Sequence, residues 1–179
     1  MIVATAGHVD HGKTSVVKHL SGVDTDSLEE ERRRGLTINL GYAYLHADAD
    51  TRVGLIDVPG HSRFINTMIA GVSGIDLALI VVAADEGPMP QTMEHLEVLR
   101  LLGIGRYAIV ITHIDRVERP RVVQVTEALQ SAMGMQWPVF QVNNIDGSGV
   151  DDLKSYLLQM AVEQSAKSRE GYFRLSIDR

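Results

Sequence analysis

Hydrophobic and polar residues alternate along the chain in blocks that predict strands separated by helices. Short apolar runs bounded by turn residues predict strands over residues 2–6, 38–47, 52–57, 75–84, 107–112 and 139–142. Apolar residues three and four apart predict helices over residues 13–20, 62–70 and 89–102, a fourth carrying Val122, Val125 and Leu129, and a last one carrying Leu153, Leu157 and Met160. Because most of the strands lack a polar face, they indicate a mostly parallel sheet with helices on both sides, a three-layer α/β fold.

Three segments do not follow this alternation. Residues 24–37 are polar and charged, which predicts a long loop or a loop with one helical turn, and Asp48-Ala49-Asp50 predicts a turn between two strands. Residues 163–170 are polar and are typical of a linker, whereas residues 171–179 alternate like a strand. We therefore expect one domain over residues 1–170, followed by a strand whose partners lie beyond this sequence.

Composition narrows the classes of function. The 179 residues fit one domain, and 17 Lys and Arg against 23 Asp and Glu leave a net charge of −6, which argues against binding nucleic acid through bulk charge. The absence of cysteine excludes disulfides, thiolate zinc sites, iron–sulfur clusters and cysteine nucleophiles. The longest apolar run, residues 77–84, is far shorter than the roughly 20 residues of a spanning helix, and the N-terminus has no basic leader. We expect a cytoplasmic protein with no membrane partner.

Residues 7–14, Gly-His-Val-Asp-His-Gly-Lys-Thr, match G-x-x-x-x-G-K-[ST] between a predicted strand and a predicted helix. In such a loop, successive backbone N–H groups surround a phosphate, Lys13 reaches the β- and γ-phosphates, and the Thr14 hydroxyl binds Mg²⁺. His8 and His11 also suggest a metal pair, but no third ligand is near them in the sequence, which favours loop histidines. The candidate phosphate contacts are Val9, Asp10, His11, Gly12, Lys13, Thr14 and Ser15.

Residues 57–61, Asp-Val-Pro-Gly-His, follow the third predicted strand. A carboxylate at a strand end opposite a phosphate loop is placed to hold Mg²⁺, which predicts that role for Asp57. Gly60 offers an unhindered N–H to a γ-phosphate, and His61 is then placed to orient a water; the alternative is a Pro-Gly turn beside a surface histidine. The Thr37 hydroxyl is the candidate that completes the Mg²⁺ shell when a γ-phosphate is present.

Residues 112–115, Thr-His-Ile-Asp, follow another predicted strand. A carboxylate at Asp115 accepts two hydrogen bonds from guanine N1–H and the exocyclic amine. Adenine has no such pair of donors, so binding it would leave the carboxylate unpaired. This segment therefore favours GTP over ATP.

Together these motifs resemble those of the translational GTPases, and most closely the GTP-binding domain of bacterial selenocysteine-specific elongation factors. Residues 34–44, 74–76, 91–95 and 173–179 extend the resemblance over nearly the whole chain. It implies a P-loop GTPase fold, GTP or GDP as the ligand and Mg²⁺ as the cofactor. It also implies that residues 171–179 begin a β-barrel domain. The Leu40-Gly41-Tyr42-Ala43-Tyr44 segment favours the selenocysteine factors over elongation factor Tu or an initiation factor γ-subunit.

The resemblance also implies roles for individual residues. His61 positions the attacking water, Val9 and Leu36 form an apolar gate before it, and Asp10 helps to hold a monovalent cation. Thr112, His113 and Asp115 contact the base, with His113 standing where the family has lysine. Asn143 aligns with a residue whose N–H meets guanine O6, within Val142-Asn143-Asn144 where the family has Ser-Ala or Thr-Ala. The family's partners are the ribosome, selenocysteinyl-tRNA and an mRNA hairpin, the last two bound mainly through regions beyond this sequence.

Two other classes of function stay open at this point. One is a nucleotide-dependent binding module without efficient hydrolysis, suggested by the altered guanine contacts. The other is an ATP-using phosphotransferase on the same scaffold, against which Asp115 argues. The leading prediction is a GTP-binding and GTP-hydrolysing domain of a factor that delivers selenocysteinyl-tRNA to the ribosome, with slow hydrolysis in the ribosome's absence.

Overall fold

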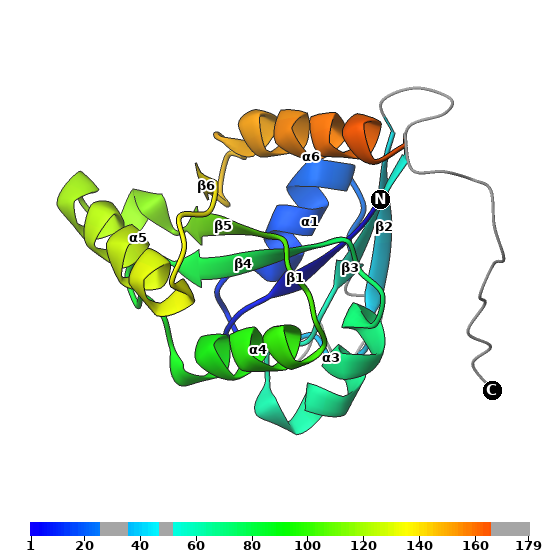
Figure 1. The fold of residues 1–179 in the computed structure, drawn as a ribbon. Coiled ribbons are helices and arrows are strands. Elements are labelled where there is room, and N and C mark those ends of the chain that lie inside the picture. Colours follow the sequence, from blue (N-terminus) through cyan, green and yellow to red (C-terminus); the bar gives the residue numbers. More distant parts are fainter. Residues whose placement is uncertain (26–35, 47–51, 166–179) are drawn as a thin grey trace, which may run out of the picture.

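The computed structural model describes residues 1–25, 36–46 and 52–165. Its centre is a six-stranded sheet with the strand order β2-β3-β1-β4-β5-β6, in which only the β2–β3 pair is antiparallel (Figure 1). The central strand β4 is buried along its whole length, as its uninterrupted apolar sequence predicts. The strands are β1 (Ile2–Ala6), β2 (Gly41–His46), β3 (Arg52–Asp57), β4 (Leu77–Ala83), β5 (Tyr107–Thr112) and β6 (Val139–Gln141).

Helices cover both faces of the sheet, so the predicted three-layer α/β fold is confirmed (Figure 1). Helices α1 (Lys13–Ser21) and α6 (Val150–Ser165) pack on one face. Helices α3 (Ile65–Val72), α4 (Pro90–Leu101) and α5 (Arg119–Met133) pack on the other. Two short 3₁₀ helices, η1 (Ser62–Phe64) and η2 (Ile114–Arg116), follow strand ends.

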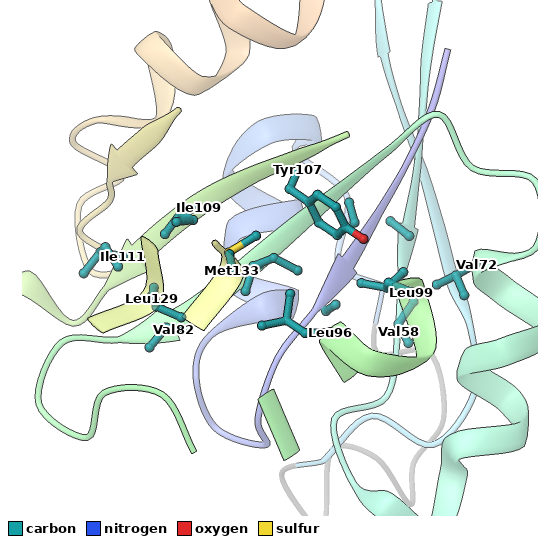
Figure 2. Packing of buried hydrophobic residues seen from close by; sticks show 14 of the residues in the cluster. Val58, Val72, Val82, Leu96, Leu99, Tyr107, Ile109, Ile111, Leu129 and Met133 are labelled. Atoms are coloured by element: carbon teal, nitrogen blue, oxygen red, sulfur yellow. The ribbon is translucent and has the colours of Figure 1, made fainter. Parts of the chain in front are cut away.

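The second of these faces shows how the core forms (Figure 2). Leu96 and Leu99 of α4 and Leu129 of α5 are almost fully buried in one apolar cluster, which also holds alternate residues of β5, among them Ile109 and Ile111. Each such side chain contributes roughly 1.5–3 kcal/mol through burial. This packing holds the strand ends that carry the predicted site.

Several predicted boundaries are corrected. The strand predicted over 38–47 begins only at Gly41, because Leu40 before it packs against Gly71 of α3 and does not extend the sheet. Helix α6 continues through Ser165, so residues 163–165 are helical and the predicted linker does not begin at 163. The segment predicted as one helix over 62–70 is η1 followed by α3, which ends at Val72.

Other predictions fall on residues outside the described part of the chain. These are most of the polar segment 24–37, the turn at residues 48–50, the rest of the predicted linker, and the strand predicted over 171–179. Within residues 1–25, 36–46 and 52–165, no helix combines the length and apolar character that crossing a bilayer requires.

Candidate nucleotide site

The loops that follow β1, β3, β4, β5 and β6 meet at the carboxyl edge of the sheet, where ligands bind in open α/β sheets. There they enclose a cavity of about 520 Å³, within the range of small-molecule sites. It brings together most of the residues predicted to contact nucleotide or metal: Val9, Asp10, Gly12, Lys13, Thr14, Ser15, Thr37, Gly60, His113 and Asp115. The other predicted residues, His11, Asp57, His61, Thr112 and Asn143, lie outside this lining.

The phosphate loop has the shape that anion binding requires. Gly12 adopts a left-handed conformation (φ 82°) directly before α1, and Asp10 is also left-handed (φ 59°). The amino end of α1 therefore points its N–H groups into the cavity, where a helix terminus favours negative charge. Lys13, the first residue of that helix, donates from Nζ to the carbonyl oxygen of His8 at 2.5 Å.

Lys13 is buried, at 6% exposure. Burial lowers the pKa of its ammonium from 10.5 to about 8, although the charges of Asp57 and Asp10 oppose the shift. A cation held this way is short of counter-charge, because its hydrogen bond goes to a neutral carbonyl. A phosphate in the cavity would supply that charge.

Gly60 closes the cavity against the phosphate loop. A Cβ at this position would lie 2.8 Å from the backbone nitrogen of Val9 and closer still to Lys13 Nζ, so only glycine allows the approach. The β3–α3 loop thus places its backbone directly beside the residues predicted to hold the terminal phosphates.

Oxygen atoms of the predicted metal ligands lie in the same region. Thr14 Oγ1 and Thr37 Oγ1 are 3.0 Å apart, which joins the start of α1 to the segment before β2. Asp57 is fully buried; its Oδ1 accepts from the Thr5 hydroxyl at 3.0 Å and its Oδ2 from the Thr25 hydroxyl at 2.8 Å. Hydroxyl and carboxylate oxygens are the donors that Mg²⁺ prefers, so the residues present fit that ion. Sequence reasoning missed Thr25, because no motif links it to Asp57 across 32 positions.

His61 lies just outside the cavity lining. Its Nδ1 accepts the backbone N–H of Arg63 at 3.1 Å, and its ring meets Phe64 edge-on at 6.1 Å between centroids. The two residues predicted as an apolar gate, Val9 and Leu36, both line the cavity.

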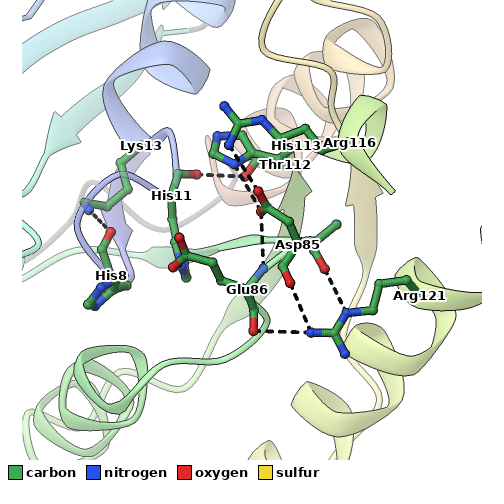
Figure 3. A network of polar contacts seen from close by, with 10 residues as sticks. His8, His11, Lys13, Asp85, Glu86, Thr112, His113, Arg116 and Arg121 are labelled. Carbon is green, nitrogen blue, oxygen red and sulfur yellow. Dashed lines mark hydrogen bonds and ion pairs between the residues drawn. The ribbon is translucent and has the colours of Figure 1, made fainter. Parts of the chain in front are cut away.

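The base end of the cavity is built from a network of polar contacts (Figure 3). His113 has a left-handed backbone (φ 53°), and its Nδ1 lies 3.3 Å from Asp85 Oδ1. Arg116 donates to the other oxygen of Asp85 at 3.1 Å. Arg121 of α5 donates to the carbonyl oxygens of the loop after β4, including that of Ala84 at 3.1 Å. Asp115 is exposed and faces the cavity, as the guanine prediction requires.

Burial alone would raise the pKa of Asp85, but hydrogen bonds from Arg116 and His113 lower it below its ordinary value. Asp85 is therefore an anion that holds the Arg116 guanidinium and the His113 ring in place through hydrogen bonds. Thr112, predicted as a base contact, is fully buried, and its hydroxyl donates to the His11 carbonyl oxygen at 2.7 Å. It ties the end of β5 to the phosphate loop.

The β6–α6 loop places a different residue at the cavity from the predicted one. The Asn143 N–H donates to the Ser148 carbonyl oxygen at 3.0 Å, so this donor is used within the loop. The neighbouring Asn144 and Ile145 line the cavity. The amide of Asn144 packs against Gly12, and neither of its polar atoms has a hydrogen-bond partner within the described chain.

Two histidine rings are buried at the phosphate loop: His95 of α4 and His11 of the loop itself. His95 of α4, at 1% exposure, accepts the Gly7 N–H at Nδ1 (3.1 Å), and burial together with the charges of Lys13 and His8 lowers its pKa to about 4. The His11 ring is also buried, with Nε2 3.2 Å from Glu86 Oε2. Burial lowers the pKa of His11 even though Glu86 acts to raise it. Sequence reasoning did not predict a structural role for His95, which is 88 residues from Gly7.

Comparisons with known proteins agree with this geometry. A family model described as the elongation factor Tu GTP binding domain matches residues 1–168. The chain is 44% identical over 183 residues to the selenocysteine-specific elongation factor of Desulfomicrobium baculatum and 47% identical over 184 residues to that of Escherichia coli K12. Each alignment covers all of this chain but only 29% and 30% of those proteins, respectively. A crystal structure of a bacterial selenocysteine-specific elongation factor, EF-Sec, superimposes with a TM-score of 0.84 at 42% identity. The superposition covers 92% of this chain and 29% of the chain of that factor. This chain therefore spans about 30% of the length of these relatives.

Proposed function

We propose that this chain, which belongs to the family of elongation factor Tu GTP-binding domains, binds GTP and GDP with Mg²⁺ and hydrolyses GTP. We further propose that it does so as the nucleotide-binding part of an elongation factor that delivers selenocysteinyl-tRNA to the ribosome. The likeness to two selenocysteine-specific factors over the full chain supports this assignment within the family. Because the ribosome is the proposed partner, the proposed location of the factor is the cytoplasm.

The observation that carries the proposal is the division of one cavity into two ends. Lys13, Thr14 and Gly60 lie at one end, and His113 and Asp115 at the other. A cation short of counter-charge and a helix amino end suit a polyphosphate. An exposed carboxylate suits the paired donors of guanine.

At the phosphate end, Lys13 and the backbone N–H groups of residues 9–15 hold the phosphate oxygens. Thr14, Thr37 and Asp57 are the residues that would hold Mg²⁺, Asp57 through water. The ion, when bound, neutralises charge that develops on the phosphates during transfer. The Gly60 N–H is placed to detect the terminal phosphate, because its backbone lies against Lys13 and Val9.

His61 is proposed to position the attacking water. With Nδ1 accepting the Arg63 N–H, the neutral imidazole carries its proton on Nε2. That nitrogen is then a donor, which suits a role in orienting a water better than a role in removing its proton. Val9 and Leu36 line the cavity as an apolar gate between the ring and the nucleotide, and we propose that the ribosome opens this gate.

The partners of the whole factor follow from the same assignment. The ribosome acts on this domain, whereas selenocysteinyl-tRNA and an mRNA hairpin bind mainly through the larger part of the protein. This chain contributes the nucleotide-dependent step.

Competition binding tests the choice of nucleotide. Fluorescent GDP bound to the chain should be displaced by GDP and GTP at low concentrations and by ATP only at concentrations higher by several orders of magnitude. Inosine nucleotide, which lacks the exocyclic amine, should fall between them. In Asp115→Asn, the preference for guanine over hypoxanthine should shrink, because the amide no longer accepts both donors. Equal displacement by ATP would favour a phosphotransferase instead.

Hydrolysis is tested in the full-length factor with purified ribosomes. Phosphate release should rise with ribosomes and should fall strongly in His61→Ala, while GDP affinity stays the same. Absence of release from the unsubstituted factor would favour a binding module without efficient hydrolysis. Release that His61→Ala leaves unchanged would remove His61 from the mechanism.

A further inference from the structure

Asp57 is held by two threonine hydroxyls that come from different parts of the fold. Thr5 belongs to β1, next to β3, and Thr25 lies after α1, four residues beyond its last residue. Thr5 Oγ1 lies 3.0 Å from Asp57 Oδ1, and Thr25 Oγ1 lies 2.8 Å from Asp57 Oδ2. Each carboxylate oxygen therefore has its own hydroxyl partner.

The direction of both hydrogen bonds is determined. An ionised carboxylate only accepts, so both hydroxyls donate to it. The Thr5 oxygen in turn accepts the Val58 N–H at 3.1 Å, which ties that hydroxyl to the backbone of the same loop. Two hydrogen bonds leave Asp57 with unused lone pairs on each oxygen, enough to accept from metal-bound water.

Thr25 is itself held in place. It is 7% exposed, and its side chain packs against Gly41 at the start of β2, where a Cβ would lie 2.5 Å from Thr25 Cβ. The same hypothetical Cβ would lie 3.2 Å from Asp57 Cβ, so Gly41, Thr25 and Asp57 share one contact. The glycine makes room for the threonine, and the threonine orients the carboxylate.

We propose that Thr25 is a positioning residue for Mg²⁺, which acts by orienting the Asp57 carboxylate toward the ion's bound water. This inference rests on the proposed function, because it assumes that the site binds Mg²⁺ with a guanine nucleotide. Thr25 contacts Asp57 and not the ion. Hydrogen-bond partners that orient a metal ligand commonly contribute 10- to 100-fold to metal affinity.

The test compares three variants of the full chain with the unsubstituted protein. Thr25→Val removes the donor but keeps the shape of the side chain, and Thr25→Ser restores the donor. Thr92→Val is the matched control, because Thr92 is equally a buried threonine and its hydroxyl has no hydrogen-bond partner within the described residues. Dissociation of fluorescent GDP is followed as free Mg²⁺ is varied, and GDP affinity is measured separately in EDTA.

We expect Thr25→Val to need at least tenfold more Mg²⁺ for half-maximal retention of GDP, with unchanged GDP affinity in EDTA. Thr25→Ser and Thr92→Val should both behave as the unsubstituted protein does. An unchanged Mg²⁺ requirement in Thr25→Val would overturn the inference. Equal loss of GDP affinity with and without Mg²⁺ would also overturn it, because the hydroxyl would then support the fold alone. If the unsubstituted chain bound no GDP, or bound it without regard to Mg²⁺, the proposed function itself would fail.

Discussion

The two ends of the nucleotide cavity are built by different means. At the phosphate end, the central groups are backbone N–H groups, half-buried threonine hydroxyls, the buried Asp57 carboxylate and a buried lysine, Lys13, whose ammonium donates to a carbonyl oxygen. At the base end, side chains from separate loops pair with each other: Asp85 contacts the partly buried His113 ring and forms an ion pair with the exposed Arg116. Arg116 is 57% exposed at its side chain, whereas Lys13 is 6% exposed as a residue.

This difference explains why the phosphate end requires particular residues, whereas the base end depends on pairs of side chains. Backbone geometry at the phosphate end depends on glycines that no other residue replaces, as Gly60 shows. At the base end, the His113 ring lies within hydrogen-bond distance of a neighbouring carboxylate, that of Asp85. The comparison implies that substitutions have large effects at the buried end and small effects at the exposed end.

The largest expected effect comes from removing the buried cation. Lys13→Met should weaken GDP binding by roughly 30-fold to several-thousand-fold, which corresponds to about 2–5 kcal/mol for the loss of one partner of a buried, hydrogen-bonded charge pair. Lys154→Met on α6 is the control, since that lysine does not line the cavity. Calorimetry of both variants measures the difference. If Lys13→Met lost less than threefold in GDP affinity, the contrast between the phosphate end and the base end of the cavity would be wrong.

The next effect concerns stability at acid pH through His95. The folded-state pKa of about 4 lies below the ordinary 6.5, so the folded protein prefers the neutral ring. The resulting stability is fully present above pH 6.5 and is lost as the pH falls from 6.5 toward 4, by about 3 kcal/mol. Protonation would also place a hydrogen on Nδ1, which accepts the Gly7 N–H.

Urea unfolding of the unsubstituted protein and of His95→Asn between pH 7.5 and 4.5 measures this contribution. The asparagine keeps an acceptor but does not titrate, so the free energy of unfolding of His95→Asn should fall less over that pH range than that of the unsubstituted protein. His46→Asn, at an exposed strand position, should follow the unsubstituted protein. Parallel profiles for all three proteins would show that His95 does not carry the pH dependence.

A smaller effect is expected in the pH dependence of nucleotide binding. Phosphate favours the charged form of Lys13, so the pKa of this ammonium should be higher with GDP bound than the value of about 8 without it. GDP affinity should therefore be constant with respect to this group below pH 8 and should fall by up to about tenfold per pH unit above it, which is about 1.4 kcal/mol. Calorimetry at pH 8.5 in buffers of different ionisation enthalpy should detect proton uptake on binding. Lys13→Arg, which stays charged, should take up fewer protons.

The sequence predicts well those elements of structure that are determined by residues close together in the chain. The apolar run of β4 and the glycine spacing of residues 7–14 act within a few residues, so the pattern alone predicts the central strand and the glycine turn before α1. Long-range partners are not accessible in this way. His95 reaches Gly7 and Thr25 reaches Asp57 only because the sheet order brings β1 between β3 and β4.

The errors have the same physical origin. Residues 38–40 are apolar enough for a strand, but Leu40 buries its side chain against α3. The guanine contact predicted from Asn143 stays a prediction, but the Asn143 N–H donates to the Ser148 carbonyl oxygen within the loop, a partner that the sequence pattern did not indicate. Tertiary contacts, which periodicity does not encode, decide both cases.

The smallest expected effect is at the exposed end, and it gives the sharpest comparison. Asp85→Asn removes the anion that pairs with the exposed Arg116, and a pair of this kind contributes at most about 1 kcal/mol. The His113 ring keeps a hydrogen-bond partner in the asparagine amide. GDP affinity should fall by no more than about fivefold at low salt. Because salt screens exposed charges, the difference from the unsubstituted protein should disappear near 1 M salt. The loss in Lys13→Met should persist there, since a buried charge is screened far less. A large, salt-resistant loss in Asp85→Asn would mean that the base end is as deeply coupled to the nucleotide as the phosphate end.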